Sequence, residues 1–133
     1  MITYRIGNDL GLDAVIELYR VSTLGERRPV DDRERMRLML ANANLVITAW
    51  DEKLLVGIAR SVSNFATYLS DLAVRVSHQK QGIGRELIRR TQAQGGQATV
   101  ILLSAPKAAE YYPHIGMKPH PSAWTLASGT KLP

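Results

Sequence analysis

Cysteine is absent from this chain of 133 residues, and aromatic residues make up only 6% of it. Without thiols the chain cannot form disulfides, bind zinc through thiolates or use a cysteine nucleophile. No apolar run approaches the roughly 20 residues that a membrane-spanning helix needs. The sequence also lacks a His-x-x-x-His pair and a cluster of carboxylates, so it predicts no metal site.

The composition that remains is typical of a globular domain, with 45% apolar and 22% charged residues. No linker or shift in composition divides the chain, so we expect a single domain over residues 1–133. Residues 2–6 alternate like a strand and lack the basic-then-apolar layout of a secretion signal. We therefore expect a cytoplasmic protein without a membrane segment.

The net charge of +5 raises the possibility of nucleic-acid binding, which depends on where along the chain the charge lies. Residues 26–37 contain five arginines against four acids, which predicts a mixed, solvated surface. Residues 80–90 contain four basic residues against the single acid Glu86. No basic stripe interleaved with aromatics and no helix-turn-helix pattern accompanies the charge, so a nucleic-acid partner is not expected.

Hydrophobic periodicity predicts alternating strands and helices along the whole chain. The expected strands are 2–6, 45–50, 53–62, 67–76, 98–103 and one near 122–127, and the expected helices are 10–24, 31–42, 82–94 and 106–113.

The most informative segment runs from the strand over 67–76 into the helix over 82–94. Leu72, Val74 and Val76 alternate as in a half-buried strand, and glycines at 82 and 84 precede a helical pattern. The first N–H groups of a helix have no partner within it and favour an anion, and glycine leaves room for one. The segment therefore predicts a phosphate-binding loop.

The spacing Gln79-x-x-Gly82-x-Gly84 closely resembles the acetyl-CoA pyrophosphate loop of the GNAT superfamily of N-acetyltransferases. A second segment, from Ala105 to Met117, resembles the superfamily pattern Asn-x-x-Ala-x-x-x-Tyr-x-x-x-Gly-Phe. It departs from that pattern at its ends, where Ala105 replaces Asn and Met117 replaces Phe. The first change removes one expected cofactor contact, and the second is a volume-tolerant apolar exchange.

The resemblance implies an α/β (α+β) fold with a mixed, mostly antiparallel sheet flanked by helices, in which two neighbouring strands splay apart to admit acetyl-CoA. It also implies direct transfer of the acetyl group to an amine, with acetyl-CoA as co-substrate and no acyl-enzyme. The residues expected to bind acetyl-CoA are Leu72, Ala73, Val74, Gln79, Lys80, Gln81, Gly82, Ile83, Gly84, Arg85, Ser104 and Lys107.

There are two catalytic candidates, one from the resemblance and one from the alternation of the strand over 67–76. Tyr112 matches the family tyrosine beside the CoA sulfur and is expected to protonate the leaving thiolate. Asp71 is expected to face the opposite side of its strand from Leu72, where it would act as a base or anchor a cationic amine. Tyr68 and ordered water are alternative routes for the proton.

The acceptor is not encoded in any portable motif, and a small-molecule amine is the favoured prediction. Acetylation of a protein N-terminus or of aminoacyl-tRNA is an alternative, as is a non-catalytic domain that senses acyl-CoA or docks a partner. A homodimer is compatible with each of these functions.

Overall fold

The computed structural model describes all 133 residues, and their contacts divide the chain into two compact units, Met1–Leu103 and Ser104–Pro133. The first unit carries the sheet and its covering helices. The second carries two short helical turns.

The sheet of the first unit has five strands in the order β1-β2-β3-β4-β5. The first three pairings are antiparallel and the last is parallel, which confirms the predicted mixed, mostly antiparallel sheet. The strands are β1 (Ile2–Ile6), β2 (Leu45–Asp51), β3 (Leu54–Ser63), β4 (Ala66–Val74) and β5 (Thr99–Ile101).

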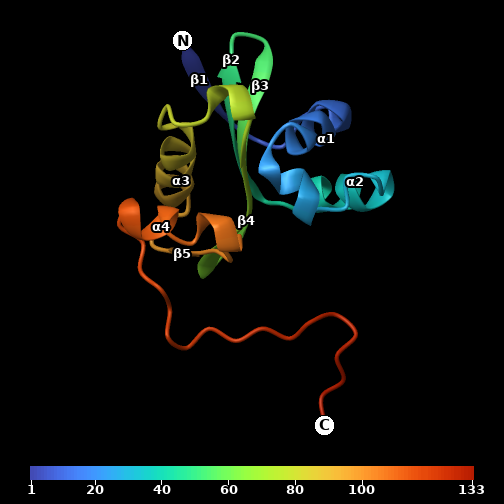
Figure 1. The fold of residues 1–133 in the computed structure, drawn as a ribbon, viewed down its shortest axis with the longest axis vertical. Coiled ribbons are helices and arrows are strands. Elements are labelled where there is room, and N and C mark those ends of the chain that lie inside the picture. Colours follow the sequence, from blue (N-terminus) through green and yellow to red (C-terminus); the bar gives the residue numbers. More distant parts are fainter. The chain divides into compact units, whose positions relative to one another are not determined.

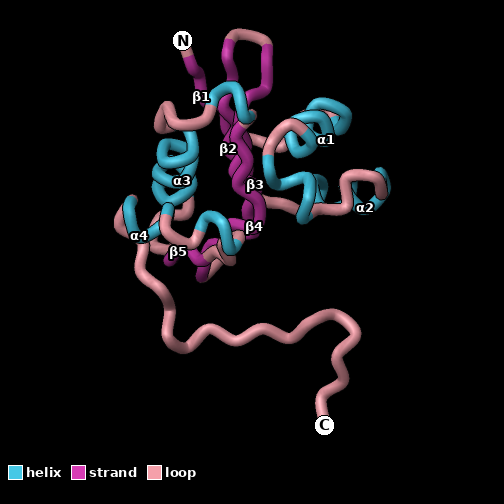
Figure 2. Tube along the Cα trace, in the orientation of Figure 1, coloured by secondary structure: helices cyan, strands magenta, loops and turns pink.

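Helices cover both faces of this sheet (Figures 1 and 2). On one face lie α1 (Leu12–Arg20) and α2 (Arg33–Ala41), and on the other lies α3 (Ile83–Gln94). The 3-10 turn η1 (Thr23–Arg27) lies between α1 and α2, and the 3-10 turn η2 (Val76–His78) lies between β4 and α3. No helix in the structure combines the length and apolar character that crossing a membrane requires.

The main core lies between the sheet and the helices α1 and α2. Its buried side chains are Val15, Ile16, Leu18, Tyr19, Leu24, Met36, Leu40, Ala43, Val46, Leu55, Ile58 and Ala73. On the other face, α3 packs very close to β3 at Gly57, where an added Cβ would lie 3.0 Å from Leu87 Cδ1 and 3.2 Å from Ile83 Cγ2. Glycine at this position therefore lets α3 press directly onto the sheet.

The predicted divergence of neighbouring strands lies between β4 and β5. These strands pair only where Ala66–Tyr68 meets Thr99–Ile101. The rest of β4, residues 69–74, pairs with β3 on one side and with no strand on the other. The backbone of this stretch therefore presents an open edge.

A β-bulge interrupts β4 at Ser70, because Arg60 pairs with Asp71 whereas the next residue, Ser61, pairs with Leu69. Ser70 is thus an extra residue without an opposite partner. The Ser70 hydroxyl and the Asp71 carboxylate both accept hydrogen bonds from the guanidinium of Arg60, so two successive side chains of β4 lie on the same face of the sheet. Strict alternation would place Ser70 and Asp71 on opposite faces of the sheet, so the bulge departs from the predicted pattern.

The predicted helix over 10–24 is too long, because α1 ends at Arg20 and the chain enters η1. The Ser22 hydroxyl accepts a hydrogen bond from the Leu24 N–H and begins that new turn. Gly25 then passes so near α1 that an added Cβ would lie 2.6 Å from the Tyr19 carbonyl oxygen. The serine cap and this close passage explain why the helix stops.

Two predictions for the second unit are wrong. The expected helix over 106–113 is instead the 3-10 turn η3 (Pro106–Ala108) followed by the single turn α4 (Tyr111–His114). Pro113 explains the break, since it has no N–H for a helical bond to residue 109. The expected strand near 122–127 does not form, because this stretch pairs with no other strand.

Candidate functional site

The loop between η2 and α3 has the backbone shape expected of an anion site. Lys80 and Gly82 have left-handed φ angles of 62° and 82°. No side chain caps α3, and its first backbone bond runs from the Glu86 N–H to the Gly82 carbonyl. The N–H groups of residues 83–85 are therefore left for an external acceptor.

The charges around this loop are not equivalent. Glu86 forms ion pairs with Arg89 at 2.6 Å and with Arg90 at 2.8 Å. Hydrogen bonds first from Arg89 and then from Arg90 lower the pKa of Glu86 to about 2. Lys80 and Arg85 are exposed and have no such partner, so these two cations are the ones available to a phosphate.

The other cofactor-binding residues predicted in the first unit lie beside this loop. Leu72, Ala73 and Val74 belong to the part of β4 that has no β5 partner. The Gln79 side chain donates a hydrogen bond of 2.9 Å to the Val74 carbonyl and ties the loop to the end of the strand. The structure thus brings the open strand edge and the loop together in one continuous segment.

Asp71 lies at the centre of a buried ionic cluster rather than in an open gap. Its carboxylate is 0% exposed and accepts hydrogen bonds from Arg60 Nε at 2.6 Å, Arg28 Nε at 2.5 Å and the Tyr19 hydroxyl at 2.6 Å. Burial alone would raise the pKa of Asp71, but the bonds and charge of Arg60, with Tyr19 and Arg28, outweigh it and hold the pKa below its usual value.

These surroundings do not favour either role predicted for Asp71. A base must be able to take a proton, whereas two guanidinium groups stabilise this carboxylate in its ionised form. An anchor for a cationic amine must be reachable, and this side chain is fully buried. The pKa of Tyr19 is raised, mainly by burial of its hydroxyl and further by the charge of the Asp71 carboxylate.

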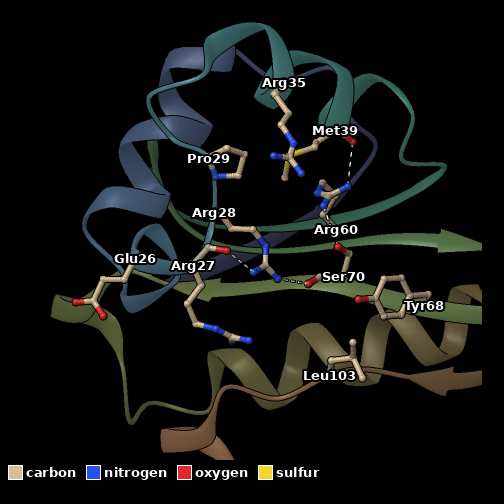
Figure 3. Close-up of a pocket in the computed structure, with 10 residues that line it drawn as sticks. All are labelled: Glu26, Arg27, Arg28, Pro29, Arg35, Met39, Arg60, Tyr68, Ser70 and Leu103. Carbon is tan, nitrogen blue, oxygen red and sulfur yellow. Dashed lines mark hydrogen bonds between the residues drawn. The ribbon is translucent and has the colours of Figure 1, made fainter. Parts of the chain in front are cut away.

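A pocket of about 620 Å³ opens above this cluster (Figure 3). We call it the arginine pocket, because Arg27, Arg28, Arg35 and Arg60 line it, together with Glu26, Pro29, Met39, Tyr68, Ser70 and Leu103. Its wall includes the bulge of β4 and Tyr68, the last β4 residue that pairs with β5.

The remaining predicted residues belong to the second unit. Ser104 is its first residue, Lys107 lies in η3, and Tyr112 lies in α4 with its ring edge-on to Tyr111 at 5.2 Å. Gly116, with φ 95°, ends α4, and its N–H bonds to the Pro113 carbonyl while the Met117 N–H bonds to that of Tyr112. This pair of bonds is a Schellman cap, which gives the motif glycine a structural reason.

A family model described as an acetyltransferase (GNAT) domain matches residues 20–130. The chain belongs to the GNAT acetyltransferase family. The matched range covers the loop over residues 79–84, the open edge of β4 and residues of both units. Among proteins with curated descriptions, none matches this sequence significantly.

Solved structures of GNAT proteins are similar to this chain over nearly its whole length. A GNAT family acetyltransferase from Streptococcus pneumoniae TIGR4 is 25% identical over 89% of this chain and 88% of its own, with a TM-score of 0.72. The aminoglycoside N-acetyltransferase AAC(6')-Iy in complex with CoA is 16% identical, over 98% and 96%, with a TM-score of 0.76. An aminoglycoside acetyltransferase from an uncultured soil metagenomic sample, in complex with sisomicin, is 22% identical over 98% and 97%, with a TM-score of 0.71.

Sequence reasoning missed the arginines that line the pocket of this GNAT protein. Arg28 stands in a run of mixed charge that predicted only solvated surface, yet its side chain is 19% exposed and paired with Asp71. Arg60 gave a usable signal, since it is the only charged residue in the otherwise buried strand β3. A buried charge needs a partner of opposite sign, so Arg60 pointed to a carboxylate nearby.

Proposed function

We propose that this protein transfers the acetyl group of acetyl-CoA directly to an amine in a ternary complex. The observation that carries the proposal is the loop over 79–84, with its two left-handed residues, which leads into an uncapped helix directly after an open strand edge. A pyrophosphate fits the N–H groups of residues 81–85, and Lys80 and Arg85 add charge. By resemblance, Ser104 and Lys107 complete the cofactor site.

The strand β4 connects the proposed pyrophosphate site with the arginine pocket. From Val74 to the bulge at Ser70 the chain advances about 13 Å, at roughly 3.3 Å per residue. An extended pantetheine arm laid along the open edge would bring its thioester towards the bulge, where Ser70 and Tyr68 line the pocket. We therefore assign the acceptor amine to this pocket.

In the proposed reaction, the neutral amine nitrogen attacks the thioester carbonyl, so that a C–N bond forms and the C–S bond breaks. The amine nitrogen gives up a proton, and the leaving sulfur takes one. As the resemblance implies, we assign the Tyr112 hydroxyl as the donor of the proton that the leaving sulfur takes. We assign water as the acceptor of the proton that the amine gives up. Asp71 becomes a positioning residue that fixes Arg28 and Arg60.

Both units then serve one acetyltransferase domain over residues 1–133, in the cytoplasm, acting on a small-molecule amine. Two of the structural neighbours are aminoglycoside acetyltransferases, which supports an acceptor of that size.

Thiol release tests the proposal directly. The purified protein is mixed with acetyl-CoA and a panel of amines, and free CoA is measured with a thiol reagent. Because the chain contains no cysteine, all of the signal comes from CoA. We expect turnover with at least one amine, and at least tenfold weaker acetyl-CoA binding in Gly84→Val, about 1.4 kcal/mol. Acetyl-CoA binding without turnover on any amine would identify a sensor domain instead.

Neutralising the two unpaired cations should make acetyl-CoA binding less dependent on salt. We expect the double variant Lys80→Gln, Arg85→Gln to bind acetyl-CoA more weakly than wild type, with a larger loss at low than at high ionic strength, because exposed charges are screened by salt. Calorimetric titration at two salt concentrations measures this difference. The matched control is Arg89→Gln, whose charge already pairs with Glu86. An unchanged affinity of the double variant at low salt would contradict the assignment.

A further inference from the structure

The arginine pocket carries an excess of positive charge that the protein itself leaves unbalanced. Its four arginines face two acids, Glu26 in the lining and Asp71 beneath it, which leaves a net charge of +2. In Figure 3 the carboxylate of Glu26 points away from the guanidinium groups. The pocket is therefore positive where a ligand would enter.

The nearby acids are occupied elsewhere. Asp31 pairs with Arg20, Glu34 pairs with Arg37, and Asp32 accepts the Arg35 N–H as the cap of α2. The side chains of Arg27 and Arg35 are exposed and have neither an ion pair nor a hydrogen bond. These two arginines are thus available at the mouth of the pocket.

The floor of the pocket is held rigidly. Arg28 donates to Asp71, to the Arg27 carbonyl at 2.8 Å and to the Ser70 carbonyl at 2.7 Å. Arg60 donates to Asp71, to the Met39 carbonyl at 3.0 Å and to the Ser70 hydroxyl at 3.0 Å. Each guanidinium has five N–H groups, and these bonds use three of them. A fixed fork of this kind suits the oxygens of a carboxylate or phosphate.

We propose that the acceptor amine carries an anionic group, a carboxylate or a phosphate, which the arginine pocket binds. The proposal rests on the proposed function and narrows its acceptor. A polycationic amine is unsuited to this pocket, since like charges would have to approach in a partly desolvated space. The pyrophosphate of CoA does not account for the arginines, because its proposed loop follows the Val74 end of β4, about 13 Å along the strand from Ser70 at roughly 3.3 Å per residue.

Matched pairs of amines test the proposal by thiol release. Glycine is compared with glycinamide, and O-phosphoethanolamine with ethanolamine, so that each pair differs in the anionic group, and the cation spermidine completes the set. We expect kcat/KM to be at least about tenfold higher for one anionic member than for its neutral partner. The pair that shows the preference distinguishes carboxylate from phosphate. Chemistry alone would favour glycinamide over glycine, because its amine is less basic and is more often neutral. A preference for glycine would therefore come from binding of its carboxylate.

Two variants link the preference to the pocket. The double variant Arg27→Gln, Arg35→Gln should raise the KM of the anionic amine about tenfold or more and leave the KM of acetyl-CoA unchanged. Arg27→Glu with Arg35→Glu should reverse the preference towards the neutral or cationic amine. The control Arg37→Gln lies on the same helix, pairs with Glu34 outside the pocket and should change neither value.

The outcomes distinguish a failure of the anionic-acceptor proposal from a failure of the acetyltransferase proposal. Turnover that is equal for the members of both pairs, or fastest with spermidine, overturns the anionic acceptor and leaves the acetyltransferase proposal standing. A preference that survives Arg27→Glu with Arg35→Glu also overturns it. Absence of both acetyl-CoA binding and turnover in the wild type would overturn the proposed function itself.

Discussion

Replacing Asp71 by alanine is expected to lower the free energy of unfolding by about 3–5 kcal/mol. The carboxylate is 0% exposed, and its removal leaves Arg60, whose side chain is 8% exposed, without its counter-charge. The Tyr19 hydroxyl and the Nε of Arg28 lose their acceptor at the same time. Urea unfolding followed by circular dichroism measures the change.

The matched control is Asp31→Ala, which removes an aspartate that is 95% exposed and also paired with an arginine, Arg20. Exposed pairs contribute at most about 1 kcal/mol, so this variant should unfold almost as wild type does. A loss for Asp71→Ala as small as that of the control would show that the cluster contributes little.

Asp71 should also make the free energy of unfolding depend on pH in the acid range. The pKa of Asp71 is lower in the folded protein than in the unfolded chain, so the unfolded chain binds this proton more readily. Its contribution is complete above the ordinary pKa of about 3.9 and is lost as the pH falls through the lower folded value. Wild type should therefore lose stability below about pH 4 more steeply than Asp71→Ala does.

Tyr112→Phe is expected to lower kcat about 100-fold, the lower end of the range for a general acid. The change removes the proposed proton donor and keeps the aromatic ring, so the dissociation constant of acetyl-CoA should move little. Steady-state thiol release with the best acceptor, together with calorimetry, measures both quantities. A pre-steady-state burst experiment establishes that the chemical step limits turnover.

Tyr111→Phe is the matched control for Tyr112→Phe. It removes a hydroxyl from the neighbouring ring of the same helical turn, one position away from the family motif. We expect its kcat to stay within about twofold of wild type, since it has no proposed role in proton transfer. Equal losses in the two variants would mean that hydroxyl packing in α4, and not proton donation by Tyr112, explains the effect.

The glycines at 82 and 84 and the alternation before them predict a strand, a loop and a helix within about two residues of their observed bounds. The predicted face of the strand is wrong, however. Val76 lies in η2 and is exposed, and the buried side chains are those of Asp71 and Ala73 rather than Leu72 and Val74. The bulge at Ser70 was not predictable in this way, because it depends on the partner strand, where Arg60 and Ser61 sit opposite Asp71 and Leu69. Alternation describes one strand alone and does not report an extra residue.

The arginine pocket escaped prediction for a related reason. Along residues 26–37 the arginines and acids nearly cancel in number, but in the folded chain they do not all pair with one another. Asp31 and Glu34 meet Arg20 and Arg37 at the surface, while Arg28 turns inward to Asp71, 43 positions further on. Long-range pairing, and not the linear tally, decides which charges a ligand meets.

The carboxylate of Asp71 has a practical consequence for engineering this protein. It joins three distant parts of the chain: the segment that follows η1 through Arg28, the strand β3 through Arg60 and the helix α1 through Tyr19. The segment after η1, which lines the arginine pocket, is therefore tied to the core by a buried ion pair. A chimera that takes this segment from a relative must keep an arginine at position 28, because without it the buried carboxylate of Asp71 loses one of its two counter-charges.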